Sequence, residues 1–283
     1  MVNRMSKNPI SRLSGFVVVT GASSGIGLEL ARRAGEDGCQ LILAADRDLT
    51  EGATAARTAG AASVQTVEAD LSTPEGLAAL LSIIGDRPVA ALIANAGMSK
   101  GGAFLDQAWE DMAHTIDTNA TGTVALIHAI GRRMRARDAG RILVTGSIVG
   151  DIPGPFNLAY NSTKAFLNDF CAGLAEELRD TALTVTCLLP GGTDTDFFRH
   201  ADMEDALVAR VPKADPARVA RDGYQALLDG KGHIVSGPLN KMLVLLAGIV
   251  PDAVLAEIHR RMAVGEQDED HARPRHQKGA SAA

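Results

Sequence analysis

The sequence predicts a three-layer, doubly wound α/β fold, in which a seven-stranded parallel sheet carries helices on both faces and a helical extension follows at the C-terminus. Short runs rich in Val, Ile and Leu recur along the chain, separated by amphipathic segments of helical length. Near-continuous apolar strands that alternate with helices are typical of a parallel sheet buried on both faces. Hydrophobic residues make up 46% of the 283 positions, which is enough for a sizeable core.

The strands and one long helix can be placed from the pattern. The expected strands lie at 16–20, 41–45, 64–69, 90–96, 141–147, 184–190 and 233–237. A helix is expected to begin near Asn157. On it, Phe166, Phe170, Leu174 and Leu178 stand at steps of four, which predicts a stripe that packs on the sheet or on another helix.

We expect one domain over 14–264, because no internal repeat or linker divides the chain. Two apolar helices are predicted at about 238–263, and the stretches 1–13 and 265–283 are predicted to be disordered tails. The run "MLVLLAGIV" at 242–250 is too short to span a bilayer and is followed by Pro251, so we expect a buried or interfacial helix.

Composition argues against several classes of function. The formal charge is −6 and no run of Lys or Arg exceeds short pairs, so no nucleic-acid partner is expected. Cys39, Cys171 and Cys187 are odd in number and widely spaced, which indicates neither a disulfide framework nor a metal cluster. The opening residues lack the apolar core of a signal peptide, and we expect a cytoplasmic location.

A glycine-rich turn follows the first strand, in "FVVVTGASSGIGLELARR". Gly21, Gly25 and Gly27 lack side chains, so a diphosphate can approach the backbone and meet the N–H groups and dipole of the next helix. A tight strand-to-helix turn also needs glycine for structural reasons, but its place in the first βαβ unit favours a dinucleotide. The predicted contacts in this turn are Gly21, Ser23, Ser24, Gly25, Ile26 and Gly27.

The second strand ends near two charged residues. Asp46 stands nineteen positions after Gly27, where an acidic residue binds ribose hydroxyls, although it can also cap the following helix. Arg47 can instead meet a 2′-phosphate. Because a carboxylate repels that phosphate, we favour NAD as the cofactor, with NADP left open.

The next two strands also end in candidate cofactor residues. Asp70, beside Leu71, either accepts a hydrogen bond from the adenine amino group or caps a helix. Asn95, Ala96 and Gly97 are small residues that let the chain pass under the cofactor. All these positions lie at the carboxyl ends of strands, where open α/β sheets bind ligands.

Several motifs together resemble the short-chain dehydrogenase/reductase family in its form with one Rossmann domain. They are "TGASSGIG" (20–27), "NAG" (95–97), Asn119 in "DTNATG", Ser147, Tyr160 with Lys164, and "PGGTDT" (190–195). Tyr160 and Lys164 share a helix face at i and i+4, and Ser147 precedes Tyr160 by thirteen positions, as in the family. The resemblance covers about 14–235.

The resemblance implies an NAD(P)-dependent oxidoreductase that moves a hydride between nicotinamide C4 and a carbonyl or secondary alcohol. It implies that Tyr160 is the general acid/base and that Lys164 lowers its pKa and binds the nicotinamide ribose. It also implies that Ser147 binds the substrate oxygen and Asn119 holds a water in a proton relay. A free tyrosine, with a pKa near 10, needs such a nearby cation to act as a base at neutral pH.

The resemblance extends to the nicotinamide end. It implies that Thr195 and the backbone of Thr193 bind the carboxamide, in the segment that includes Pro190 and Gly191. Ala45 stands where NAD-dependent members have Asp, and Asp46 stands where NADP-dependent members have Arg, so cofactor choice stays open.

The substrate side is implied less specifically. The family places a lid at about 191–215, and 149–157 would form the other wall of an apolar pocket for a hydrophobic ketone or alcohol. The lid residues that either line this pocket or only pack the lid are Phe197, Phe198, Met203, Leu207 and Val208.

Assembly and two other functions are left open by the sequence. The C-terminal helices can deepen the pocket, join subunits or rest on a membrane surface. Family precedent favours a homodimer or homotetramer built on helices around 119–136 and 157–179. The alternative functions are a non-catalytic dinucleotide-binding regulator and a membrane-surface scaffold.

Overall fold

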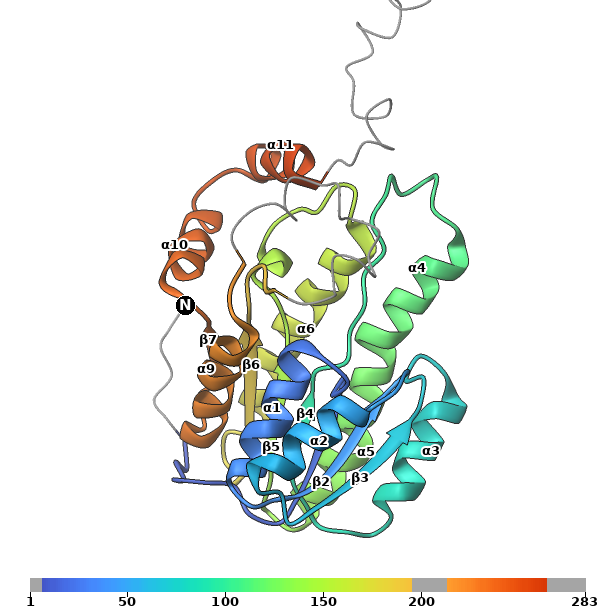
Figure 1. The fold of residues 1–283 in the computed structure, drawn as a ribbon. Helices are drawn as coiled ribbons and strands as arrows, with labels where there is room; N and C mark the ends of the chain where they lie inside the picture. Colours follow the sequence, from blue (N-terminus) through green and yellow to red (C-terminus); the bar gives the residue numbers. More distant parts are fainter. Residues whose placement is uncertain (1–6, 195–212, 264–283) are drawn as a thin grey trace, which may run out of the picture.

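The computed structural model describes residues 7–194 and 213–263. A parallel sheet of seven strands lies at its centre (Figure 1). The strand order is β3-β2-β1-β4-β5-β6-β7. Successive strands are added on one side of β1 up to β3 and on its other side from β4 onward, so the switch point lies between β1 and β4. The predicted doubly wound sheet is confirmed. The strands are β1 (Phe16–Thr20), β2 (Gln40–Ala45), β3 (Ser63–Glu68), β4 (Val89–Ala94), β5 (Arg141–Thr145), β6 (Thr184–Leu189) and β7 (His233–Val235).

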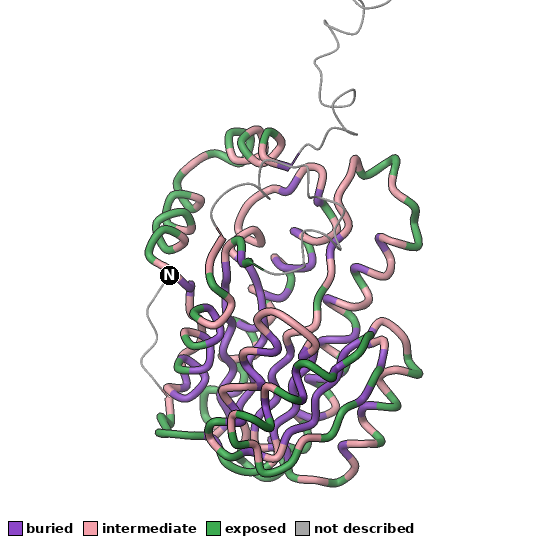
Figure 2. The backbone as a smooth tube through the Cα atoms, viewed as in Figure 1, coloured by how far each residue is buried: buried purple, intermediate pink, exposed green. Residues whose placement is uncertain are grey.

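Helices cover both faces of this sheet. One face packs on α1 (Gly25–Glu36), α2 (Thr50–Ala59) and α9 (Pro216–Asp229), and the other on α3 (Pro74–Ile84), α5 (Thr123–Ala136) and α6 (Leu158–Glu177). In β1, Val18 belongs to one apolar core while Val17 and Val19 belong to the other, because successive side chains of a strand point to opposite faces. Both cores are buried (Figure 2), which explains the uninterrupted apolar runs.

Helix starts follow local capping chemistry. Thr73 caps α3 by accepting a hydrogen bond from the Gly76 N–H at 3.0 Å, and Asp215 caps α9 by accepting from the Ala217 N–H at 3.0 Å. Each cap is followed by proline, whose missing N–H costs nothing at the first helical position. These caps fix where the chain turns back along the sheet.

The stripe predicted on α6 is partly wrong. Phe166 is 47% exposed and stacks on Phe170, with ring centroids 5.9 Å apart, whereas Leu167 and Cys171 supply the buried face. A step of four advances about 40° beyond a full turn, so a run of such steps winds around the helix. Only its later members reach the core: Phe170 and Leu174 pack against it and Leu178 is buried.

Residues 7–13 are ordered, contrary to the prediction that they belong to a disordered tail. The Lys7 ammonium donates to the carbonyl oxygens of Leu178 and Leu183, at 2.7 and 3.0 Å. Leu13 is buried, and its N–H donates to the Asp37 carboxylate at 2.7 Å. These hydrogen bonds join residues 7–13 to the ends of other elements, which the local sequence of the segment does not indicate. The predicted tails at 1–6 and 265–283 lie outside the described residues.

Further helical segments stand above the carboxyl ends of the strands. Helix α4 (Trp109–Ile116) continues through a π-helical segment, η1 (Asp117–Gly122), into α5. The C-terminal helices α10 (Pro238–Ala247) and α11 (Asp252–Ala263) lie where an extension was predicted, with α11 at the top of Figure 1. None of the helices within 7–194 and 213–263 is long and apolar enough to cross a membrane.

Candidate active site

One pocket opens at the carboxyl ends of the strands and contains most of the predicted site residues. Those that line it are Gly21, Ser23, Ser24, Gly25, Ile26, Asp46, Arg47, Asp70, Leu71, Asn95, Ala96, Gly97, Ser147, Tyr160, Lys164, Pro190, Gly191 and Thr193. Gly27 and Asn119 are buried and are not part of its lining. Thr195 lies outside the described residues, as do the lid residues between 195 and 212.

The glycine turn leaves no room for side chains. Gly21 and Gly25 have φ of 63° and 55°, a left-handed conformation that favours glycine. A Cβ on Gly27 would lie 2.0 Å from the Gly21 carbonyl oxygen. At the start of α1, the Ser24 side chain makes no capping hydrogen bond. The first N–H groups of α1 therefore stay available to an anion in the pocket, and the turn fits a dinucleotide diphosphate.

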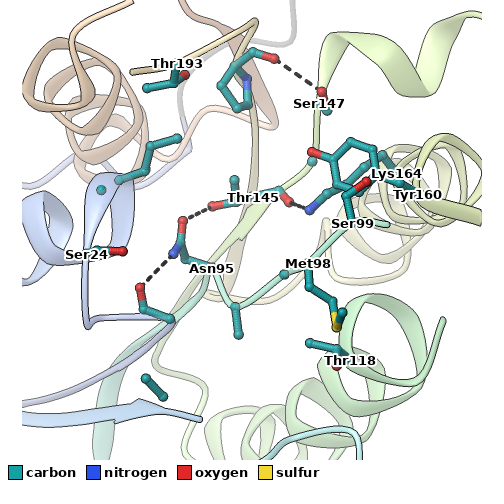
Figure 3. Close-up of a pocket in the computed structure, with 18 of the residues that line it drawn as sticks. Ser24, Asn95, Met98, Ser99, Thr118, Thr145, Ser147, Tyr160, Lys164 and Thr193 are labelled. Carbon is teal, nitrogen blue, oxygen red and sulfur yellow. Dashed lines mark hydrogen bonds between the residues drawn. The ribbon is translucent and has the colours of Figure 1, made fainter. Parts of the chain in front are cut away.

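Hydrogen bonds join the ends of three strands beneath the pocket, and Figure 3 shows the bond between Thr145 and Asn95. The Thr20 hydroxyl accepts from the N–H groups of Asn95 and Ala96, both at 3.0 Å. The Asn95 amide donates to the Thr20 and Gly21 carbonyls at 3.3 Å, and the Thr145 hydroxyl donates to Asn95 Oδ1 at 2.9 Å. Asn95 thus joins β1, β4 and β5 and supports the glycine turn from behind.

Charged residues surround the end of the pocket next to β2 and β3. Arg47 donates twice to the Asp46 carboxylate, Nε to Oδ1 at 2.8 Å and Nη2 to Oδ2 at 2.9 Å. These hydrogen bonds hold the pKa of Asp46 below its usual value, against the opposing effect of burial. Asp70 accepts from the Ser72 N–H at 2.9 Å and lies 3.8 Å from His114 Nε2.

Neither carboxylate is a helix cap. Helix α2 begins after Leu49 without a side-chain cap, and α3 is capped by Thr73. The capping alternatives for Asp46 and Asp70 are therefore wrong, and both carboxylates line the pocket.

Tyr160 and Lys164 lie together at the buried end of the pocket. Lys164 Nζ is 5.6 Å from the centre of the Tyr160 ring and donates to the Thr145 carbonyl at 2.7 Å. Burial lowers the pKa of Lys164 to about 8. Burial raises the pKa of Tyr160 to about 12, and a hydrogen bond with Ser147 acts in the opposite direction. The phenol is thus protonated at neutral pH and has a cation and a hydroxyl beside it.

Ser147 links three parts of the site. Its backbone is extended and its hydroxyl caps the short 3-10 helix η2 (Ile148–Asp151), accepting from the Val149 N–H at 3.3 Å. The same hydroxyl donates to the Pro190 carbonyl at 3.4 Å. These contacts hold the hydroxyl beside Tyr160, and rotation of its O–H away from the Pro190 carbonyl lets it donate to an oxygen that gains negative charge.

Asn119 is fully buried in η1 and its amide is occupied by neighbouring groups. Its Oδ1 accepts from the Met98 N–H at 2.8 Å, while Nδ2 donates to the Met98 carbonyl at 2.9 Å and to Thr163 Oγ1 at 3.0 Å. A Cβ on Gly97 would lie 3.2 Å from Asn119 Oδ1 and 3.3 Å from Lys164 Nζ. Asn119 therefore positions the chain after β4, and its place in a water relay stays a prediction.

Several residues that line the pocket were not predicted. They include Met98, Ser99, His114, Thr118, Thr145, Asn161 and His259. Ser99 and Thr145 were within reach of sequence reasoning, because each lies within two residues of a predicted strand-end position. His259 was not, since it enters from α11, 98 positions after Asn161.

The family profile described as short chain dehydrogenase matches residues 15–206. The chain belongs to this family. It is 32% identical over 215 residues to retinol dehydrogenase 8 of Bos taurus, covering 74% of this chain and 69% of the bovine protein. It is 34% identical over 189 residues to human 17-beta-hydroxysteroid dehydrogenase type 1, covering 64% of this chain and 58% of the human protein.

A solved structure agrees with the fold. A short-chain dehydrogenase from Sphingobium yanoikuyae in complex with NADPH is 28% identical, with a TM-score of 0.71 over 84% of this chain and 97% of that protein. The prediction of an oxidoreductase of this family, acting on an alcohol or a ketone, is confirmed.

Proposed function

We propose that this enzyme interconverts a secondary alcohol and a ketone of a large apolar substrate, with NAD or NADP as its redox partner. The observation that carries the proposal is the meeting of Tyr160, Ser147 and Lys164 in the same pocket as the glycine turn. Tyr160 can act as an acid, Ser147 can donate to an oxyanion and Lys164 supplies a cation, and all three lie beside the glycine turn that fits a dinucleotide.

Each residue has a role that follows from its surroundings. The bound dinucleotide supplies or accepts the hydride. During ketone reduction, the Tyr160 phenol donates its proton to the carbonyl oxygen while the Ser147 hydroxyl hydrogen-bonds the same oxygen. Lys164, whose Nζ lies 5.6 Å from the centre of the Tyr160 ring, stabilises the phenolate that remains through its positive charge. In alcohol oxidation the phenolate accepts the proton instead.

We favour NAD over NADP, with both able to bind. Asp46 places a carboxylate in the cofactor pocket, and Arg47 is held by that carboxylate through two hydrogen bonds. A 2′-phosphate must compete with Asp46 for this guanidinium. The Sphingobium relative was solved with NADPH, so NADP remains within the proposal.

The substrate is proposed to be a bulky apolar molecule. Met98 and Val149 line the pocket together with polar groups of the 147–161 segment. The two relatives above are named for retinol and a hydroxysteroid, both large and apolar. The lid predicted at about 191–215 stays a prediction, because residues 195–212 lie outside the described residues.

A homodimer or homotetramer remains our proposal for assembly, as does a cytoplasmic location. Phe166 on α6 and Leu158 at its start are exposed apolar side chains on the predicted interface helices, and Trp109 and Ile116 of α4 are exposed as well. These are the side chains that a subunit interface on these helices would bury. Light scattering after gel filtration would measure the mass, and a monomer would contradict this part of the proposal.

The test of the proposed function has two stages. NADH and NADPH are titrated by fluorescence, and the tighter cofactor is then used with a polycyclic ketone, a retinoid and a small cyclic ketone. Turnover of a bulky substrate supports the proposal. Tight cofactor binding without turnover across a wider panel would instead support the dinucleotide-binding regulator.

A further inference from the structure

The C-terminal helix α11 contributes an imidazole to the pocket. His259 lines the pocket wall although α11 begins after the last strand of the sheet. Its Nδ1 lies 3.1 Å from the Pro155 carbonyl, and its Nε2 lies 3.4 Å from Asn161 Nδ2. The ring thus lies between the 149–157 loop, which was predicted to form one wall of the substrate pocket, and the start of α6.

The direction of each hydrogen bond follows from the neighbouring groups. Asn161 Nδ2 also donates to the Val149 carbonyl at 3.2 Å, which orients the amide with its N–H groups toward the loop and the imidazole. His259 Nε2 must then accept, so Nδ1 carries the proton and donates to Pro155. This is a neutral imidazole, in agreement with the burial that lowers the pKa of His259.

Asn161 is buried and closely packed, so its side chain holds the imidazole and the loop in place. It is only 3% exposed, and a Cβ on Gly154 would lie 2.2 Å from its amide group. The loop therefore packs tightly on this side chain. Asn161 also follows Tyr160 directly on α6, so the residue that holds the loop and α11 is adjacent in sequence to the proposed acid.

We propose that His259 and Asn161 form a clamp that holds α11 as a roof over the substrate end of the pocket, which makes His259 a positioning residue for bulky substrates. This inference rests on the proposed function. A large apolar ketone extends from Tyr160 to the wall formed by the loop and α11, whereas a small ketone occupies only the region beside Tyr160 and Ser147. Loss of the clamp therefore affects binding of the large ketone and leaves the proton transfer unchanged.

Four variants test the clamp, each assayed in the full chain with a polycyclic ketone and a small cyclic ketone. In His259→Ala we expect KM for the polycyclic ketone to rise about tenfold, the effect of losing about 1.4 kcal/mol of binding. The kcat for both ketones, KM for the small ketone and the Kd of the cofactor are expected to stay unchanged. Arg261→Ala, on the same helix but exposed and paired with Glu257, is the control and should behave as wild type.

Two further substitutions separate the hydrogen bond from simple space filling. His259→Gln can place its carbonyl oxygen where Nε2 accepts from Asn161, and should recover part of the lost affinity. His259→Phe fills the space without an acceptor and should resemble His259→Ala. Equal affinity in the Gln and Phe variants would overturn the role of the hydrogen bond.

The clamp and the proposed function fail in different ways. If wild type turns over the small ketone but His259→Ala leaves KM for the polycyclic ketone unchanged, the clamp is overturned alone. If wild type turns over neither ketone while binding cofactor, the proposed function is overturned, and the selectivity of the clamp with it. Hydrogen exchange gives an independent readout: His259→Ala should increase exchange in 149–157 and 252–263, and no increase would overturn the clamp.

Discussion

The two ends of the pocket are built in different ways. The cofactor end uses backbone and small side chains from the first hundred residues, held by the hydrogen bonds between Thr20 and Asn95. The substrate end uses Ser147 and Asn161 together with His259 of α11, which stands 98 positions after Asn161. Local motifs therefore reveal the cofactor end, although long-range hydrogen bonds hold it together, whereas the substrate end includes a residue that no local motif indicates.

Tyr160 stands at the boundary between these ends, and its loss should have the largest effect. In Tyr160→Phe the ring remains but no proton can be transferred, so turnover should fall about 10²- to 10⁴-fold. The Kd of the cofactor should change little, because the glycine turn is untouched. Steady-state kinetics and a fluorescence titration measure the two quantities on one preparation.

The contrasting result would be a parallel loss of turnover and cofactor affinity in Tyr160→Phe. That outcome would mean that Tyr160 supports the cofactor end, and that the two ends are not separable as described. Turnover within about twofold of wild type would remove the acid/base role.

Gly27→Ala should disturb the glycine turn at the cofactor end directly. The new Cβ would meet the Gly21 carbonyl oxygen at 2.0 Å and Asn95 Nδ2 at 2.5 Å, so backbone must move. We expect the free energy of unfolding to fall by about 1–3 kcal/mol and dinucleotide affinity to fall at least about tenfold. Urea unfolding and cofactor titration provide the measurements.

Gly173→Ala is the matched control for that substitution. Gly173 lies in α6, and a Cβ added there would have nothing within 4 Å, so alanine fits. It should raise the free energy of unfolding by about 0.5–1 kcal/mol, because alanine favours the helix. If both variants lose stability equally, close packing at the glycine turn does not explain the result.

The accuracy of the sequence predictions follows the same division. The seven strands were placed within about two residues of their observed bounds, since apolar runs and turns are local signals. The predicted site residues at the strand ends line one pocket, because the carboxyl ends of parallel strands meet at the same edge of the sheet. His259 was missed because its contact with Asn161 spans 98 positions, and the order in residues 7–13 was missed because Lys7 and Leu13 donate to groups in other elements.

The pH dependence should separate the two directions of reaction. Burial raises the pKa of Tyr160 to about 12, so the phenolate needed for alcohol oxidation becomes more abundant as pH rises. Below that pKa its fraction increases about tenfold per pH unit, so oxidation should accelerate from about pH 7 to about pH 8. Above about pH 8 the rise should level off, because burial lowers the pKa of Lys164 to about 8 and the lysine then loses the charge that stabilises the phenolate. Ketone reduction uses the protonated phenol and should change little over this range.

Lys164→Met sharpens this test. Without a cation beside the ring, the phenolate is less stable, and the rise in the oxidation rate should move to higher pH. Profiles of kcat/KM against pH, recorded in both directions for wild type and variant, measure the shift. Identical profiles would show that Lys164 acts on the cofactor alone and not on Tyr160.

Cofactor selection should respond least, because the charges involved are half-exposed. Asp46→Asn removes the negative charge that repels a 2′-phosphate and frees Arg47 from its ion pair. Exposed pairs of this kind contribute about 0.2–1 kcal/mol, so the ratio of NADP to NAD affinity should rise by up to about fivefold. Arg47→Gln should move the ratio in the opposite direction, since it removes the guanidinium that a phosphate would contact.

Titration of both variants with both cofactors would measure these ratios. A shift of the same sign in the two variants would mean that neither charge faces the 2′ position. Unlike the glycine turn, this part of the cofactor end depends on side-chain charge. Small shifts of opposite sign in the NADP-to-NAD ratio would therefore show that Asp46 and Arg47 select between the two cofactors, whereas the glycine turn binds both.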